Sequence, residues 1–121
     1  MLIVYDSRTG NVERFVRKLG LDVLKLHDSE SQQVEEPFVM VTYTTGFGHV
    51  PAQVMNFLNR NRAHLRGVSA SGNRNWGASF AGSADAIAEQ FGVPIVHKFE
   101  LSGTSTDVER FREGLNRVAA H

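Results

Sequence analysis

Short apolar runs alternate with helix-like patterns along almost the whole of this chain. A strand, a helix and a further strand in succession favour parallel pairing, because the helix returns the chain to the starting edge of the sheet. Right-handed crossovers and short connections leave an α/β fold as the expectation: a doubly wound five-stranded parallel sheet, order 2-1-3-4-5, with helices on both faces. The predicted strands are Met1–Tyr5, Leu21–Leu26, Phe38–Tyr43, Gly67–Ser71 and Val93–Leu101.

Apolar residues spaced three and four apart predict the helices between these strands. Gly20 and Gly92 are placed to end two of them, and Pro51 is placed to begin another. Thr106 and Glu109 have the spacing of a capping box before the last helix. The apolar faces comprise Val12, Phe15, Val16 and Leu19; Val54, Phe57 and Leu58; Ala84, Ile87, Ala88 and Phe91; and Val108, Phe111, Leu115 and Val118.

The composition restricts the class of protein. A chain of 121 residues with 41% apolar residues supports one packed core, so a single domain over residues 1–121 is expected. The absence of cysteine excludes disulfides, thiolate nucleophiles and cysteine-ligated metals. Thirteen basic residues balance thirteen acidic ones, which argues against nucleic acid or a membrane surface as a partner. The sequence shows neither a membrane span nor a signal peptide, so a cytoplasmic location is expected.

The turn after the first predicted strand has the composition of an anion site. Ser7, Thr9 and Asn11 offer side-chain donors, and Gly10 allows a ligand to approach the backbone closely. The first amides of a helix lack intrahelical acceptors, so a phosphate monoester is the expected ligand of this turn. The alternative is an ordinary strand–turn–helix connection in which Asn11 caps the helix.

Two further loops follow predicted strands at the same edge of the sheet. Residues 44–50 place Phe47 between two glycines, and residues 72–77 carry Trp76 near Asn73. Because strands one, three and four are neighbours in the predicted order, one ligand could contact all three loops. Aromatic surfaces, backbone amides and a phosphate nest together favour FMN. In the alternative interpretation, Phe47 and Trp76 are packing residues.

A flavin-free, receiver-like binding module is a more distant alternative. Such a module would keep Asp6 and Lys98, but Tyr43 and Thr44 stand where it needs an acid after the third strand. Asp6 is unfavourable beside a phosphate, and we expect it to cap amides of its own turn instead. The histidines show no ligand spacing, so no metal site is expected.

Longer segments resemble one protein family. Ser7–Asn11 resembles the FMN-phosphate loop of flavodoxins. Gly67–Gly77 and Phe99–Thr104 resemble signature segments of the NrdI family, the small flavodoxin-like proteins that serve class Ib ribonucleotide reductase. The loop Thr42–Pro51 resembles the short version found in that family, and the similarity extends essentially from end to end.

The resemblance implies a function. Family members bind FMN, and the reduced flavin reacts with molecular oxygen to supply an oxidant, understood as superoxide. The manganese-containing small subunit of the reductase receives this oxidant and forms its dimanganese–tyrosyl radical cofactor. An unidentified partner would reduce the flavin, and the flavin rather than a catalytic side chain would carry the chemistry. A generic one-electron-transfer flavodoxin for another enzyme is the alternative.

The resemblance also implies site residues. Val12 departs from many flavodoxins, which have a further hydroxyl there, so one phosphate contact must come from backbone or another side chain. Arg8 and Arg74 are candidates for the rim on which a partner docks. The expected phosphate loop comprises Ser7, Arg8, Thr9, Gly10, Asn11 and Val12; Thr44, Thr45, Gly46, Phe47 and Gly48 would line the ring, and Asn73, Trp76 and Gly77 would flank its other side.

Overall fold

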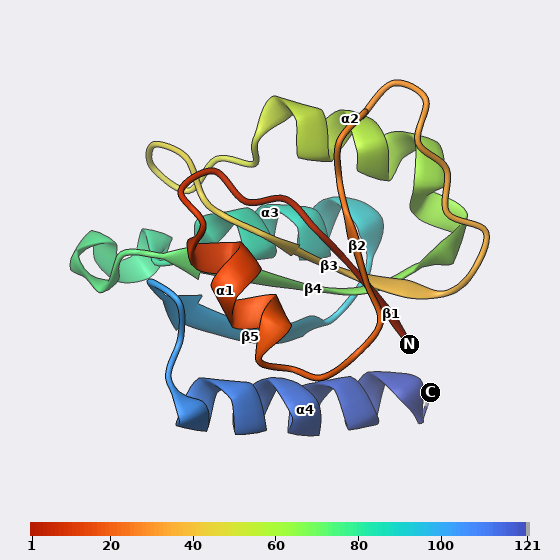
Figure 1. Cartoon of the computed structure of the whole chain (residues 1–121). Coiled ribbons are helices and arrows are strands. Elements are labelled where there is room, and N and C mark those ends of the chain that lie inside the picture. Colours follow the sequence, from red (N-terminus) through yellow and green to blue (C-terminus); the bar gives the residue numbers. More distant parts are fainter. Residues whose placement is uncertain (121) are drawn as a thin grey trace.

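A central parallel sheet covered by helices makes up the computed structural model, which describes residues 1–120 (Figure 1). Its strand order is β2-β1-β3-β4-β5 with every neighbouring pair parallel, so the predicted doubly wound sheet is confirmed. The strands are β1 (Leu2–Tyr5), β2 (Val23–Lys25), β3 (Phe38–Thr42), β4 (Leu65–Gly72) and β5 (Ile95–Glu100). The helices are α1 (Asn11–Arg17), α2 (Ala52–Asn61), α3 (Gly82–Phe91) and α4 (Ser105–Ala119), with short 3-10 helices η1 (Arg62–His64) and η2 (Arg74–Ser79).

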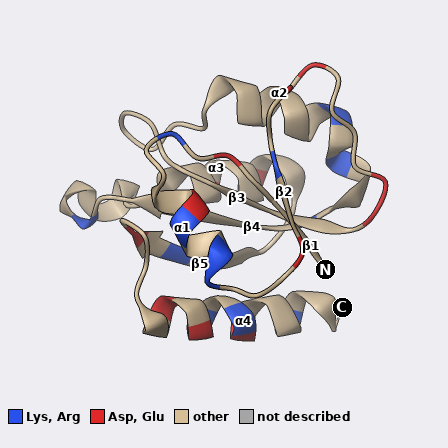
Figure 2. Ribbon diagram, viewed as in Figure 1, with Lys and Arg blue, Asp and Glu red and all other residues tan. Residues whose placement is uncertain are grey.

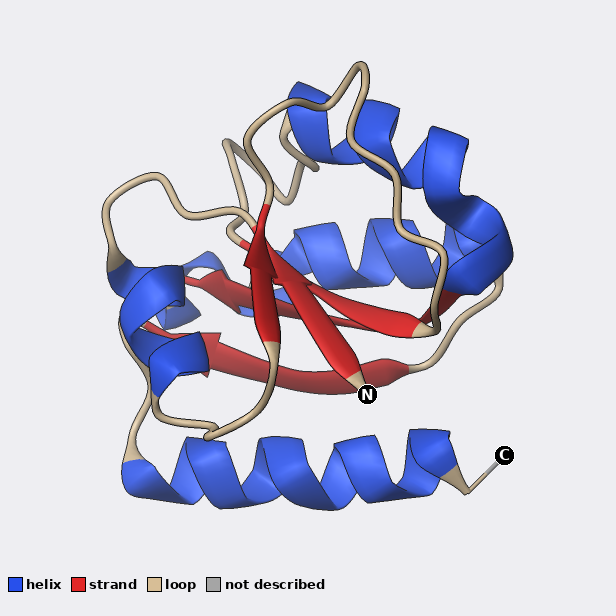
Figure 3. Ribbon diagram, turned by 45° about the vertical axis from the view of Figure 1, so that its right-hand side comes forward, coloured by secondary structure: helices blue, strands red, loops and turns tan. Residues whose placement is uncertain are grey.

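Helices cover both faces of the sheet (Figure 3). Successive side chains of a strand point to opposite faces, and the central strand β3 is buried throughout. Phe38 and Met40 join the apolar cluster beneath α2 and α3, whereas Val39 and Val41 join the cluster beneath α1 and α4. A strand buried on both faces explains the continuous apolar run in the sequence.

The observed bounds of β4 and β2 differ from the predicted ones. β4 begins at Leu65, two residues before the predicted Gly67, because the buried Leu65 pairs with Phe38. β2 is shorter than predicted and pairs with β1 alone. An edge strand has one neighbour, so fewer of its residues are held in the ladder.

Helix α1 begins at Asn11, one residue earlier than it would if Asn11 were the capping residue. Asn11 is already helical, and the capping position is Gly10, whose φ of 89° is left-handed. Glycine has no Cβ and adopts this conformation without steric cost. At α2, Pro51 is the capping residue, and the helix proper begins at Ala52.

The predicted capping box of α4 is wrong by two positions. Thr104 and Asp107 form the box, and not Thr106 with Glu109. The Thr104 hydroxyl accepts from the Asp107 amide at 3.2 Å, and the Asp107 carboxylate accepts from the Thr104 amide at 2.8 Å. Gly103, which directly precedes the box, has a left-handed φ of 71°, so the turn after β5 ends at Thr104.

Charged side chains of both signs are interspersed along α1 and α4 (Figure 2). Such mixing agrees with the formal net charge of +0. Within residues 1–120, none of the helices combines the length and apolar character required to cross a bilayer.

Candidate functional site

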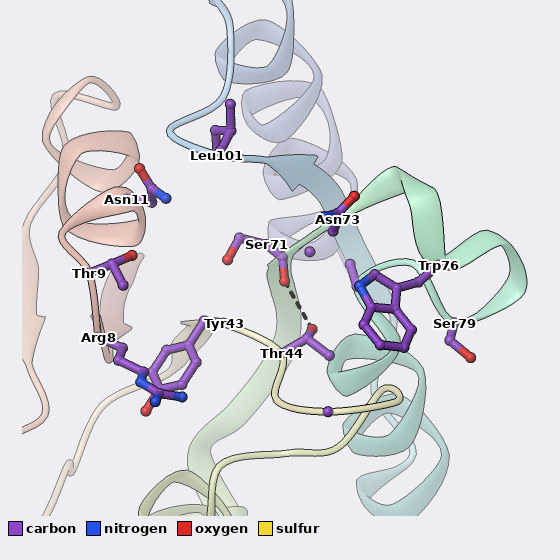
Figure 4. A pocket seen from close by; sticks show the side chains of 13 residues that line it. Arg8, Thr9, Asn11, Tyr43, Thr44, Ser71, Asn73, Trp76, Ser79 and Leu101 are labelled. Carbon is purple, nitrogen blue, oxygen red and sulfur yellow. Dashed lines mark hydrogen bonds between the residues drawn. The ribbon is translucent and has the colours of Figure 1, made fainter.

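A cavity of about 370 Å³ lies at the carboxyl ends of the strands, where loops after β1, β3, β4 and β5 converge (Figure 4). This edge is the usual ligand site of doubly wound sheets. Its lining comprises Arg8, Thr9, Asn11, Tyr43, Thr44, Gly46, Ser71, Gly72, Asn73, Trp76, Ser79, Ala81 and Leu101.

The loop after β1 contributes three of its six predicted residues to the lining: Arg8, Thr9 and Asn11. The Ser7 hydroxyl instead accepts a hydrogen bond from the Glu13 amide at 3.2 Å and so stabilises the first turn of α1. Gly10 is the cap described above. The Val12 side chain is buried in the core, so any contact that Val12 makes with a ligand comes from its backbone.

The loop after β3 forms a tight turn whose ends are joined by a pair of backbone hydrogen bonds. The amides and carbonyls of Thr45 and His49 bond reciprocally at 3.0 and 2.8 Å. Thr44 and Gly46 line the cavity, whereas Thr45 does not. Gly48 also lies outside the lining and packs against Gly82, where a Cβ would lie 2.8 Å from the Gly48 Cα.

The loop after β4 supplies Asn73 and Trp76 to the lining, whereas Gly77 of the same loop lies outside it. Phe47, from the loop after β3, also lies outside the lining. The Phe47 side chain is 74% exposed and meets the Trp76 ring edge-to-face, with centroids 4.7 Å apart. Trp76 is 42% exposed, so neither ring packs in the core. The aromatic pair therefore forms one rim of the cavity.

Hydrogen bonds tie the loop after β3 to β4 and α3. The Thr44 hydroxyl donates to the Ser71 carbonyl at 2.9 Å (Figure 4). The Thr44 hydroxyl oxygen also lies 2.8 Å from the Ser83 hydroxyl oxygen. Gly72 is equally constrained, since a Cβ there would lie 2.3 Å from the Ala81 nitrogen. The cavity wall is consequently fixed by hydrogen bonds and close packing between segments that are distant in sequence.

Sequence reasoning missed six of the lining residues. Most of them follow directly from the predicted architecture, because they occupy the last positions of strands or the first positions of loops at the same edge. Leu101 had such a signal, as it ends a predicted strand beside β4, whereas Ala81 had none, because only its left-handed φ of 48° brings it to the wall. The missed residues are Tyr43, Ser71, Gly72, Ser79, Ala81 and Leu101.

The charges around the cavity suit an anion. Arg8 is the charged member of its lining. Asp6 lies behind the loop with its side chain 9% exposed, and burial raises its pKa although Gln53 and the Ser7 amide donate hydrogen bonds to it. The Ser7 bond agrees with the expectation that Asp6 caps its own turn. Lys98 donates to the Phe80 carbonyl and the Asp85 carboxylate, so it is engaged with a different part of the fold from Asp6.

The donor set and shape of the cavity suit a flat heterocycle that carries a phosphate. Hydroxyl, amide and guanidinium donors lie on the β1 side, and the Trp76 surface lies on the opposite side (Figure 4). Among residues 1–120, no group of three or more potential metal ligands comes together.

Known proteins resemble this chain in sequence and in fold. Residues 3–113 match the family described as NrdI Flavodoxin like. The chain is 53% identical to Protein NrdI of Bacillus licheniformis over 116 residues, which covers 96% of this chain and 88% of that protein. It is 50% identical to Protein NrdI of Ruegeria sp. over 126 residues, which covers 98% and 90%.

Solved flavodoxins share the fold. The oxidised Flavodoxin 1 of Bacillus cereus superposes with a TM-score of 0.65 at 16% identity, covering 99% of this chain and 97% of that one. The Fusobacterium nucleatum flavodoxin bound to flavin mononucleotide gives a TM-score of 0.54 at 18% identity, covering 98% and 96%. With the match to residues 3–113 and relatives of at least 50% identity, this chain belongs to the NrdI flavodoxin-like family.

Proposed function

We propose that this chain is an FMN flavoprotein of the class Ib ribonucleotide reductase system. The observation that carries the proposal is the single cavity in which the loops after β1, β3 and β4 meet. Its volume of about 370 Å³ lies within the range of roughly 300–1,000 Å³ that small-molecule sites occupy. Membership of the NrdI flavodoxin-like family supports FMN as the ligand.

The phosphate of FMN would lie against the loop after β1. Arg8 supplies positive charge there, and the Thr9 hydroxyl and Asn11 amide supply uncharged donors. Hydrogen bonds to an ionised acceptor are shorter and stronger than neutral ones, so these groups favour a phosphate over a hydroxyl. The remaining loop members, Ser7 and Gly10, shape the turn.

The flavin ring would lie between the second and third loops. Trp76 offers a stacking surface, and Thr44 and Asn73 offer polar groups at the ring edge. Gly46 and Gly48 both have positive φ, at 49° and 92°, so the peptides between them can reorient without a Cβ clash. A peptide in this turn is the proposed hydrogen-bond partner that changes with the flavin redox state.

The chemistry of the proposed function belongs to the cofactor. When bound, FMN would supply the redox chemistry of the proposed function, the one-electron reduction of molecular oxygen to superoxide. The residues that line the cavity would hold the ring at the carboxyl edge of the sheet, where oxygen and a partner would reach it. The manganese-containing small subunit of the reductase is the proposed recipient, and its own metals and tyrosine carry the later oxidation.

An anaerobic reductive titration followed by visible absorbance tests this proposal. The purified protein, reconstituted with FMN, should show a flavin spectrum that bleaches on reduction and returns rapidly when air is admitted. The reduced protein, oxygen and manganese-loaded small subunit together should then generate the tyrosyl radical, measured by electron paramagnetic resonance. Omission of this chain is the matched control and should leave no radical.

Two outcomes would contradict the proposal at different levels. Slow reoxidation in air with no radical in the small subunit would favour a generic one-electron-transfer flavodoxin. A protein that stays colourless after incubation with FMN would remove the flavin and favour a flavin-free binding module.

A further inference from the structure

Two side chains from the first turn of α1 and one from the loop after β5 form a closed hydrogen-bonded triangle beside the cavity. The Asn11 carboxamide oxygen accepts from an Arg14 terminal nitrogen at 2.7 Å and from the Ser102 hydroxyl at 2.9 Å. Arg14 Nε also donates to the Ser102 oxygen at 3.0 Å. The triangle therefore joins the first turn of α1, which carries both Asn11 and Arg14, to the loop after β5.

The triangle determines which way the Asn11 carboxamide faces. Arginine has only donors, so the Asn11 atom that meets Arg14 must be the oxygen and not the nitrogen. The Ser102 hydroxyl accepts from Arg14 and gives its own proton to the same oxygen. Both lone pairs of that oxygen are then occupied, and the amide nitrogen with its two protons is left for the cavity, which Asn11 lines (Figure 4).

The surroundings hold the two donors in place. Lys18 donates to the Ser102 and Gly103 carbonyls at 3.1 and 3.2 Å, so the loop after β5 is anchored to α1. A Cβ on Gly10 would lie 2.8 Å from an Arg14 terminal nitrogen, so the glycine leaves room for the guanidinium group. The positive charge behind the Asn11 oxygen also polarises the carboxamide and strengthens its N–H donors.

We propose that Arg14 and Ser102 are positioning residues that direct the Asn11 amide nitrogen into the cavity, and thereby make the site selective for a phosphate-bearing flavin over its dephosphorylated form. This inference rests on the proposed FMN function. The Asn11 amide would then supply the phosphate contact that Val12, which has no hydroxyl, does not make.

Parallel titrations with FMN and with riboflavin test the inference, because the two ligands differ only in the phosphate. Dissociation constants are measured from the quenching of flavin fluorescence by the apoprotein. Ser102→Ala and Arg14→Met should each raise the FMN constant about fivefold to tenfold, the factor that one lost hydrogen bond carries, and leave the riboflavin constant within about twofold. Ser102→Thr keeps the hydroxyl and should retain the wild-type ratio of the two constants.

Arg17→Met is the matched control for the loss of a positive charge from α1, since Arg17 pairs with Glu13 and not with Asn11. It should leave the ratio unchanged. Thermal melts of the apoproteins show that each variant is folded. Equal losses for both ligands, or no loss for either, would overturn the inference while leaving FMN binding intact. A wild-type protein that binds neither ligand would instead overturn the proposed function.

Discussion

The buried carboxylate of Asp6 accepts a hydrogen bond from the Gln53 side-chain amide at 2.9 Å, and the same nitrogen donates to the Tyr43 hydroxyl at 2.8 Å. Tyr43 lines the cavity, so this chain of bonds connects α2 to the candidate flavin site. Burial is the largest influence on the Asp6 pKa and raises it above the ordinary 3.8, against the lowering effects of Gln53, Ser7 and Lys25.

Because the pKa of Asp6 is higher in the folded chain than in the unfolded chain, ionisation of Asp6 lowers the free energy of unfolding. The folded chain binds its proton more tightly than the unfolded chain, so stability falls as the pH rises from the ordinary pKa through the folded one. We expect Asp6→Asn, which cannot ionise, to gain stability relative to wild type between pH 4 and pH 7. Urea unfolding at several pH values measures this difference. Gln53→Leu should move the wild-type fall to higher pH, and identical pH profiles for all three proteins would contradict the assignment.

Gly72 is expected to be intolerant of any side chain for lack of space. A Cβ there would meet the Ala81 backbone nitrogen at 2.3 Å, and backbone atoms cannot rotate aside. Gly72→Ala should lower the free energy of unfolding by about 1–3 kcal/mol or more. Gly67→Ala on the same strand is the control, because its Cβ would meet a Val96 methyl group at 3.0 Å and the Pro94 carbonyl oxygen at 3.4 Å. A side-chain methyl group can shift more easily than backbone, so Gly67→Ala should cost less than Gly72→Ala. Similar losses for the two variants would contradict the close contact.

The two candidate capping boxes of α4 make opposite predictions. Thr104→Ala should cost about 1 kcal/mol of unfolding free energy, because it removes the hydroxyl that caps the Asp107 amide. Thr106→Ala should stay within about 0.5 kcal/mol, since Thr106 is exposed within the helix. Denaturant titrations of both variants distinguish them, and a larger loss at Thr106 would restore the sequence-based assignment.

The pH dependence of Asp107 has the opposite sign to that of Asp6. Burial opposes its ionisation, but hydrogen bonds from His97 and Thr104 outweigh burial and lower the pKa. A lowered pKa contributes stability that is present above the ordinary value of 3.8 and is lost as the pH falls through the folded pKa. Asp107→Asn should therefore destabilise the protein at pH 7 and approach wild type in strong acid, as urea unfolding at the two pH values would show.

The strands and helices were predictable because apolar periodicity indicates element type, and the strand order and the loops at the functional edge then followed from the rules of doubly wound sheets. Leu65 was missed as the start of β4 since Arg66 and Gly67 interrupt its apolar run. The Thr104 cap was missed because two motifs with the same spacing overlap, and only the turn geometry decides between them. Ala81 was missed because its place in the lining depends on a left-handed backbone conformation, which an alanine in the sequence does not indicate.

Trp76 is the single tryptophan of the chain, so its fluorescence reports on the cavity that it lines. Addition of FMN to the apoprotein should quench this emission with the same dissociation constant that flavin fluorescence gives. Trp76→Phe keeps an aromatic surface and should weaken binding by less than about tenfold, whereas Trp76→Ala should weaken it further, because stacking contributes about 0.5–1.5 kcal/mol beyond burial. Phe47→Ala, outside the lining, should have a smaller effect than Trp76→Ala. Unquenched emission at saturating FMN would place the flavin elsewhere.

The two arginines that the sequence placed on one docking rim should behave differently. Arg8 lines the cavity, whereas the Arg74 guanidinium lies 4.6 Å above the centre of the Phe80 ring. Arg8→Gln should raise the FMN dissociation constant about threefold to tenfold at low salt, with a smaller effect at high salt because ions screen an exposed charge. Arg74→Gln removes an equal charge from outside the lining and should change the constant by less than about twofold. Equal, salt-dependent losses would mean that both charges act through the general field, and a loss confined to Arg74 would move the phosphate to the other side of the cavity.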